Sequence, residues 1–201
     1  MARKTKAEAE RTRLRILRTS LDVFLKKGYE RTTFEDVAAR IGLSKGAVYW
    51  HFKNKPALLM ALVEHVWAKH EATMVEVGKP GSLEELRDAF VARAERWMRK
   101  AEGRKLLRLM TQMDWSSRQA RPVAMTMATH DKSLLVGMER ALGELKAKGK
   151  VREGVDVKLA AAVLTTMWLG LLKAKVNHGK MVDLPKAIGF GFDMAIASMG
   201  V

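Results

Sequence analysis

The chain has 201 residues, a formal net charge of +15 and no cysteine, and apolar residues make up 48% of it. The missing cysteine excludes both a disulfide framework and a thiolate metal site. The first residues lack the apolar core of a secretory signal, and no stretch approaches about 18 uninterrupted apolar residues, so we expect a cytoplasmic protein that enters no membrane. Residues 1–56 carry a net charge of +8, over half of the total, which suits phosphate neutralisation, although a basic protein can also simply be soluble.

The first predicted helix begins near Ala7. Leu17, Leu21 and Phe24 follow the helical period, and two lysines and Gly28 then supply a cationic last turn and a stop. This helix should pack on the two short helices that follow and complete a three-helix unit. The expected core of that unit is Leu17, Leu21, Phe24, Val37, Ile41, Val48 and Phe52.

Two short helices are predicted between residues 32 and 52. Thr33 can cap a helix that starts near Phe34, and Gly42 can end it because glycine tolerates a positive φ. Ser44 offers the next cap, and the helix after it carries Lys45, Gly46, Tyr49 and Trp50 on its front. Two helices joined by a Gly-bearing turn, the second basic and aromatic, fit a helix-turn-helix unit whose second helix enters the major groove of DNA. The same pattern also occurs in folds that touch no nucleic acid.

The residues after this pattern favour DNA binding. The segment YWHFKNK, residues 49–55, together with the spacing of apolar residues and glycine from Ile16 to Thr33, resembles the TetR family of transcriptional regulators, particularly its multidrug-efflux repressor branch. The resemblance runs from about Arg11 to about Leu62. It implies an all-α fold with a helix-turn-helix DNA-binding domain over residues 1–55 and a larger helical effector-binding and dimerisation domain over residues 56–201.

The resemblance also implies which residues meet DNA. Lys45 is the candidate for reading guanine N7/O6, and Ala47 for contacting a thymine methyl group. The branch often has Arg at the position of Lys45, and Lys lacks the planar fork of Arg, so discrimination there should be weaker. Arg3, Lys4 and Lys6 could reach the minor groove or form a solvated tail. The expected DNA-contacting set is Thr33, Ser44, Lys45, Gly46, Ala47, Tyr49, Trp50, His51, Lys53 and Lys55.

The rest of the chain also reads as helical. Asn54 should cap a long helix that runs to Met74, and the segment from Gly78 to Ser82 is the clearest break. Ser82 should cap the next helix, which Gly103 interrupts. Further helices are expected over residues 123–148, 159–176 and 184–199, with a loop at residues 116–122.

The last two predicted helices are apolar on more than one face, so they need a second packing partner. The resemblance implies that this partner is the same pair of helices from another subunit, which gives a homodimer. Gly170, Gly189 and Gly191 would let the helices approach closely. The alternative is that these helices form the central core of a monomer.

The chain has thirteen methionines, and several of them crowd the middle helices together with tryptophans. Methionine repacks around ligands of different shape, and promiscuous binding surfaces use it heavily. Each such residue alone could be core, but the resemblance implies a large apolar cavity for a hydrophobic effector. Thr111, Gln112, Thr165 and Thr166 are candidates for orienting that effector. The expected cavity lining is Trp67, Leu86, Phe90, Trp97, Met110, Met113, Leu134, Met138, Thr165, Trp168 and Leu172.

Catalysis finds little support in the sequence. No two of the five histidines stand at the i, i+4 spacing of a helical metal site, and no Gly-rich phosphate loop or nucleophile elbow is present. We therefore expect no enzyme, no metal and no cofactor. The resemblance implies instead a repressor that leaves a palindromic operator when a hydrophobic small molecule binds, and that controls efflux or lipid- and drug-response genes. The alternative is a sequence-tolerant basic DNA-binding protein without ligand control.

Overall fold

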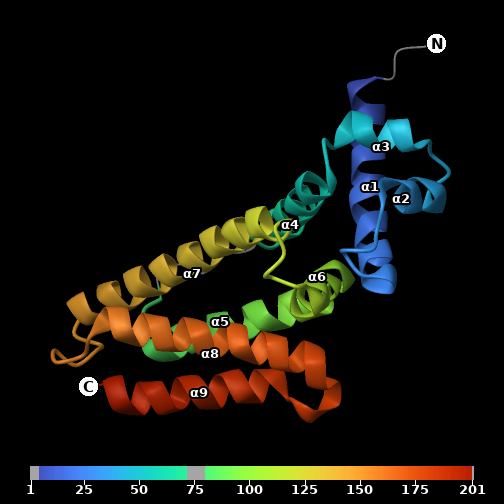
Figure 1. Ribbon diagram of the computed structural model, residues 1–201. Helices are drawn as coiled ribbons and strands as arrows, with labels where there is room; N and C mark the ends of the chain where they lie inside the picture. The colour runs from blue at the N-terminus through green and yellow to red at the C-terminus, as the bar shows by residue number, and fades with distance from the viewer. Residues whose placement is uncertain (1–4, 72–79, 201) are drawn as a thin grey trace.

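The computed structural model describes residues 5–71 and 80–200 (Figure 1). Every regular element within these ranges is a helix, which confirms the all-α prediction. The predicted arm residues Arg3 and Lys4, the helix end at Met74 and the break at Gly78 lie outside the described residues. The elements are α1 Lys6–Lys27, α2 Phe34–Arg40, α3 Lys45–His51, α4 Lys55–Glu71, α5 Leu83–Arg99, α6 Ala101–Gln112, α7 Arg121–Ala147, α8 Val157–His178, the 3₁₀ turn η1 Gly179–Met181 and α9 Leu184–Met199.

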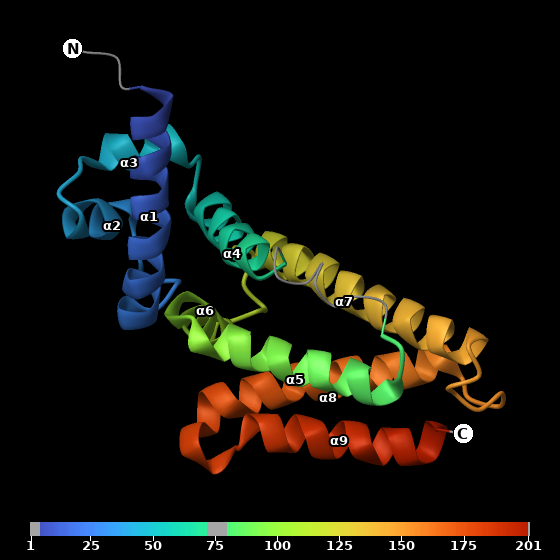
Figure 2. The same cartoon turned by 180° about the vertical axis from the view of Figure 1, so that it is seen from behind.

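The helices form a small head and an elongated body (Figures 1 and 2). The head consists of α1, α2 and α3, and α4 leads from it into the body, which contains α5 to α9. Helices α8 and α9 run antiparallel along one side, α9 also packs on α5, and α7 packs on α4 and α8. Helix α6 reaches back to α1, so the head contacts the body through α4 and α6.

The head is built as the sequence predicts. The Thr33 hydroxyl accepts a hydrogen bond from the Asp36 N–H at 3.3 Å, and the Asp36 carboxylate accepts one from the Thr33 N–H at 2.8 Å, which completes a capping box. Gly42 has a φ of +66°, as the expected stop requires. Of the predicted core, all side chains are buried except Ile41, which is half-buried. Local signals therefore account for the whole turn between α2 and α3.

The body follows its predicted helices with one clear difference. Gly103 does not interrupt a helix, because it lies buried in the first turn of α6 and the break falls at Lys100. The extended backbone of Lys100, with a ψ of 125°, separates α5 from α6. Asn54, Ser82 and Asp156 accept hydrogen bonds from backbone N–H groups at the starts of α4, α5 and α8, as predicted. The capping residues in the sequence thus locate most helix starts, but glycine does not locate every stop.

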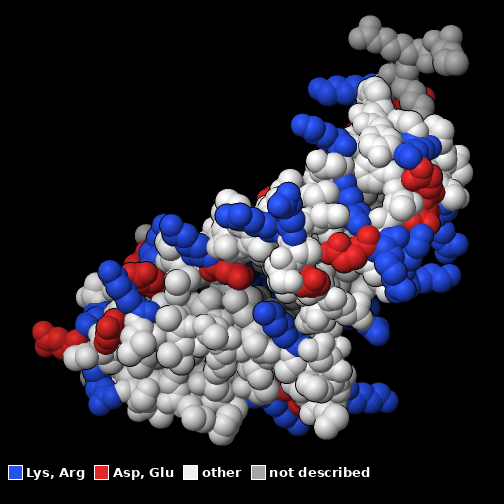
Figure 3. Space-filling view, in the orientation of Figure 1, with Lys and Arg blue, Asp and Glu red and all other residues white. Residues whose placement is uncertain are grey.

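Helices α8 and α9 expose a row of large apolar side chains along the body. Leu159, Val163, Phe190 and Met194 are each 57–68% exposed. The surface over these helices carries few charged side chains in the view of Figure 3. By length and composition alone the segment Val157–Met181 could cross a membrane. This is weak evidence for a membrane span, because a core helix of a water-soluble protein passes the same test.

Glycine serves close packing at one place between these helices. A Cβ built on Gly191 of α9 would overlap the sulfur of Met167 on α8. The predicted role of Gly191 in close helix approach therefore has a geometric basis within the subunit. Gly170 and Gly189 have no atom within 4 Å of such a Cβ, so the single chain gives them no packing reason.

Candidate nucleic-acid interface and ligand cavity

The front of α3 presents polar and aromatic side chains to solvent. Tyr49 is 51% exposed and Trp50 71% exposed, which is unusual for large aromatic residues. Ser44 caps the helix by accepting a hydrogen bond from the Ala47 N–H at 3.2 Å, and Val48 on the opposite side is completely buried. The helix is therefore held to the head by its back, and its predicted contact residues face outward.

Lys45 begins α3 and is held at the surface by two neighbours. Its ammonium forms an ion pair with the carboxylate of Glu35 on α2 and lies 5.8 Å from the ring centroid of Tyr49. The hydrogen bond from Lys45 lowers the pKa of the Glu35 carboxyl, and the same bond raises the pKa of Lys45. The candidate base-reading residue is thus charged and restrained.

Lys55 occupies a more enclosed position than its assignment as a phosphate contact suggests. Its ammonium donates hydrogen bonds of 2.8 Å to the carbonyl oxygens of both Tyr29 and Glu30, and lies 4.6 Å from the centroid of the Tyr29 ring. Burial lowers its pKa. Lys55 therefore fixes the loop between α1 and α2, in addition to any contact with phosphate.

The remaining predicted DNA contacts lie around these two lysines. Thr33 is exposed at the start of α2, and the ring of Phe34 beside it packs edge to face on Tyr49 at 4.8 Å. Gly46 and Lys53 are exposed, whereas Ala47 and His51 are half-buried. The ten predicted residues thus lie on α3 and at its N-cap, just before the start of α2, and between α3 and the first residue of α4.

Polar contacts join this head to the body. Glu102 of α6 forms ion pairs with Arg18 of α1 at 3.1 Å and with Lys69 of α4 at 2.8 Å. Lys105 of α6 reaches Asp22 of α1 at 2.5 Å. Because α6 contacts both α1 and α4, a shift of α6 would reach the head by two routes.

A small cavity lies in the body between α4, α5, α6, α7 and α8. Its volume is about 20 Å³, which is room for about one water molecule. The rings of Trp67, Trp97 and Trp168 form much of its wall, and the Trp168 indole N–H donates a hydrogen bond of 3.0 Å to the buried Phe90 carbonyl. This cavity by itself is too small for a drug-sized molecule, so the large effector cavity stays a prediction.

Five of the eleven predicted lining residues meet at this cavity, namely Trp67, Trp97, Leu134, Trp168 and Leu172. The other six are buried in the surrounding core, where they support the wall without lining it. Of the four polar candidates only Thr165 is buried, and Thr111, Gln112 and Thr166 are exposed. The six residues that do not line the cavity are Leu86, Phe90, Met110, Met113, Met138 and Thr165.

Charged and polar groups at the cavity escaped the sequence analysis. The Arg93 guanidinium lies 5.1 Å from the Trp168 ring centroid, and the imidazole of His130 stacks on Trp67 at 4.6 Å. Burial raises the pKa of the Asp131 carboxyl, which also lines the cavity. Sequence periodicity alone could not place these residues, because only packing decides which face of a helix meets the cavity.

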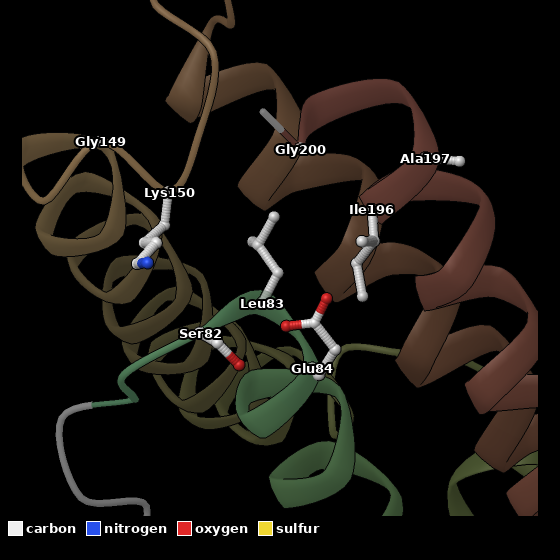
Figure 4. A pocket seen from close by; sticks show the side chains of 8 residues that line it. All are labelled: Ser82, Leu83, Glu84, Gly149, Lys150, Ile196, Ala197 and Gly200. Carbon is white, nitrogen blue, oxygen red and sulfur yellow. The ribbon is translucent and has the colours of Figure 1, made fainter.

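A second hollow lies at the far end of the body (Figure 4). Its volume is about 580 Å³, and it lies between the start of α5, the turn after α7 and the end of α9. Ser82 and Glu84 contribute oxygen atoms from one side, and Lys150 lies on the other. The Ser82 hydroxyl already caps α5, so this part of the polar lining serves the fold itself.

Comparison with known proteins places this architecture. Residues 16–62 match the family model described as "Bacterial regulatory proteins, tetR family". The solved structure of the SmeT–triclosan complex is 32% identical in sequence, with a TM-score of 0.80 over 94% of this chain and 92% of that one. The chain belongs to the TetR family. Members of this family are transcriptional regulators and not enzymes, in agreement with the absence of catalytic motifs from the sequence.

Other relatives of this TetR-family chain agree with that assignment. TtgR of Pseudomonas putida, an HTH-type transcriptional regulator, is 42% identical over 71 residues, which are 35% of this chain and 34% of TtgR. The chain therefore matches only about a third of the length of that curated relative. The repressor BepR of Brucella suis is 25% identical over 90% of this chain and 88% of BepR. NalD of Pseudomonas aeruginosa, 20% identical with a TM-score of 0.84 over 97% of this chain and 98% of that one, shares the fold.

Proposed function

We propose that this protein is a ligand-responsive DNA-binding repressor that leaves a palindromic operator when a hydrophobic small molecule binds the body. The observation that carries the proposal is the outward-facing row of Lys45, Tyr49 and Trp50 on a helix anchored by buried Val48, in a member of the TetR family. A helix presented in this way suits insertion into a major groove.

Within this proposal the DNA contacts divide into two kinds. Lys45 reads a base edge, with Ala47 available for a thymine methyl group. Thr33, Tyr49, Lys53 and Lys55 contact phosphate and sugar, which positions the helix without reading sequence. Ser44, Gly46, Trp50 and His51 line the same surface. Neutralised phosphates release counterions, so binding should weaken steeply with added salt.

The effector would enter the cavity between the three tryptophan rings. Because only about 20 Å³ is open, a drug-sized molecule must move side chains or helices to fit, and the cost of that movement couples the ligand to the head. Helix α6 both lines the cavity through Leu107 and contacts α1 and α4 through Glu102. Ligand and DNA would therefore weaken each other's binding by the same factor.

Dimerisation completes the proposal. The exposed apolar residues Leu159 and Val163 on α8, and Phe190 and Met194 on α9, are the side chains that a second subunit would cover. Gly170 would then allow close contact with the second subunit, since no atom of the single chain lies within 4 Å of a Cβ built on it. A two-fold dimer places two α3 helices on successive turns of DNA, about 34 Å apart. A dimer also accounts for the hydropathy of α8 without a membrane, in keeping with a cytoplasmic protein.

Selection of duplexes from a random pool, followed by footprinting, tests DNA recognition. We expect a protected palindrome that binds at least about a thousandfold more tightly than scrambled duplex at moderate salt. Protection without sequence preference would favour the alternative, a basic DNA-coating protein. The solved SmeT complex contains triclosan, so triclosan is the first effector probe, and it should raise the melting temperature and release the palindrome.

The relatives also suggest which genes are controlled. SmeT is the repressor of the multidrug efflux pump SmeDEF of Stenotrophomonas maltophilia, and NalD is the secondary repressor of the MexAB-OprM pump. We infer that this protein controls efflux or other lipid- and drug-response genes. Two steps test that inference. The genome of origin is searched for the selected palindrome, and transcription of the neighbouring gene is measured with and without the protein.

A further inference from the structure

The first residue of α3, the helix proposed to enter the major groove, has an acidic partner on the neighbouring helix α2. Glu35 is the second residue of α2, Lys45 is the first residue of α3, and the two side chains form an ion pair. Both are about half exposed, Lys45 at 50% and Glu35 at 55%. The pair therefore lies on the surface that the head turns toward DNA in the proposed function, and not in its core.

This pair restrains a side chain that is otherwise poorly suited to reading a base. Lysine carries a point charge on a flexible stem, and ordering that stem against a base edge costs rotamer entropy. Here the Glu35 carboxylate holds the Lys45 ammonium, and the Tyr49 ring lies 5.8 Å from it. Part of the rotamer entropy of Lys45 is therefore lost before DNA binds. The ion pair thus preorganises the side chain to some extent, as the rigid fork does in arginine.

An acid at this position also has a cost that depends on the sequence of the DNA. A carboxylate close to the phosphates is repelled by every duplex. That repulsion is offset only where the Lys45 ammonium, still held by Glu35, finds guanine acceptors. At the wrong base pair this compensation is not available, so the acid should penalise wrong sequences more than the right one.

We propose that Glu35 is a specificity-determining residue, which positions the ammonium of Lys45 before a base edge and penalises duplexes that offer Lys45 no acceptor. The inference rests on the proposed function, because it requires that α3 reads DNA. It goes beyond that function by assigning discrimination to a residue of α2, outside the recognition helix. It also makes the base preference a property of the pair and not of Lys45 alone.

The test is a comparison of Glu35→Gln with the matched variant Glu10→Gln. Glu10 is another exposed carboxylate of the head, 57% exposed and paired with Arg13 along α1, so its change removes the same charge without touching Lys45. Affinities of both variants and the wild type are measured for the selected palindrome and for scrambled duplex at one salt concentration. We expect Glu35→Gln to lower the ratio of the two affinities about tenfold, as for loss of one base-reading contact, and Glu10→Gln to leave the ratio unchanged.

A double-mutant comparison separates positioning from simple charge. In a Lys45→Ala background, the further change Glu35→Gln should leave the affinity ratio unaltered, because no side chain remains to be positioned. An equal rise in affinity for palindrome and scrambled duplex with Glu35→Gln would show that Glu35 only repels phosphate, and would overturn the inference. An unchanged ratio would overturn it as well.

Two controls keep the result interpretable. The unfolding midpoint of each variant must match the wild type, and Glu35→Asp provides a second variant that keeps the charge but shortens the reach by one methylene group. We expect the ratio of palindrome to scrambled affinity of Glu35→Asp to lie between those of Glu35→Gln and the wild type. If the wild type itself selects no palindrome, the proposed function fails. If the wild type selects a palindrome and Glu35→Gln has the same affinity ratio, only the role of Glu35 is refuted.

Discussion

The head and the body achieve order by different physical means. In the head, short helices begin at side-chain caps, and lysines tie down loops, as Lys55 does for the carbonyls of Tyr29 and Glu30. In the body, long helices bury aromatic and methionine side chains around a small cavity, and apolar side chains of α8 and α9 remain exposed. Polar geometry thus specifies the part proposed to read DNA, whereas adaptable packing builds the part proposed to sense a ligand.

The strongest way to break this comparison is to place a charge on the exposed face of the body. Val163→Glu, at a site 57% exposed on α8, should separate the proposed dimer, because an unpaired carboxylate cannot be buried there. Loss of two-site binding should weaken palindrome affinity by about a hundredfold or more. Sedimentation and DNA titration measure both effects. Met125→Glu, at a site 67% exposed on α7, is the control, and an equal loss there would deny the face its role.

The next largest effect concerns the cavity wall. Trp168→Phe removes the indole N–H that donates to the buried Phe90 carbonyl, and should lower the free energy of unfolding by about 2 kcal/mol while shifting the triclosan response. DNA affinity should stay near that of the wild type, because the head is untouched. Trp115→Phe removes a comparable bond, to the Met110 carbonyl, at a residue 40% exposed, and should leave the triclosan response unchanged. A DNA-binding defect without a ligand effect in Trp168→Phe would contradict this division.

Within the head, two lysines separate sequence reading from general attraction. Lys45→Ala should lower the ratio of palindrome to scrambled affinity about tenfold, because it removes a base contact. Lys55→Ala should weaken both duplexes alike, and should also loosen the loop whose carbonyls it now binds. Titrations against both duplexes, with a melting curve for each variant, measure these outcomes. Equal losses on both duplexes for Lys45→Ala would remove it from the reading role.

The smallest expected effect tests the polar construction of the head through pH. The Lys27 ammonium, followed by the N–H and hydroxyl of Thr33, holds the pKa of Asp36 at about 2. Since the folded pKa lies below the unfolded value near 3.8, this stabilisation is present above pH 3.8 and is lost as the pH falls toward 2.

Asp36→Asn should therefore cost about 1 kcal/mol of unfolding free energy at pH 7, the usual worth of a cap, and progressively less below about pH 4. Urea unfolding of variant and wild type from neutral pH down to about pH 3 measures that difference. Asp183→Asn, at the cap of α9 in the body, is the control, because asparagine caps a helix as well as aspartate does. A constant difference between Asp36→Asn and wild type across this range would show that charge contributes nothing.

The sequence by itself determined the features that depend on neighbouring residues. Caps at Thr33, Ser44 and Asp156, the positive φ of Gly42 and the apolar stripes of the helices are local, because each is fixed by groups within about one helical turn. The ten residues proposed to contact DNA were found together for the same reason, since they all lie within 23 consecutive positions.

Only the tertiary structure decided how distant residues meet. It joined Lys55 to carbonyls 25 and 26 positions away, paired Glu35 with Lys45 across a turn, and brought Arg93, His130 and Asp131 to one cavity from two helices. The physical reason is that a helix repeats every ~3.6 residues, so periodicity shows which side chains share a face, but packing alone decides what that face meets.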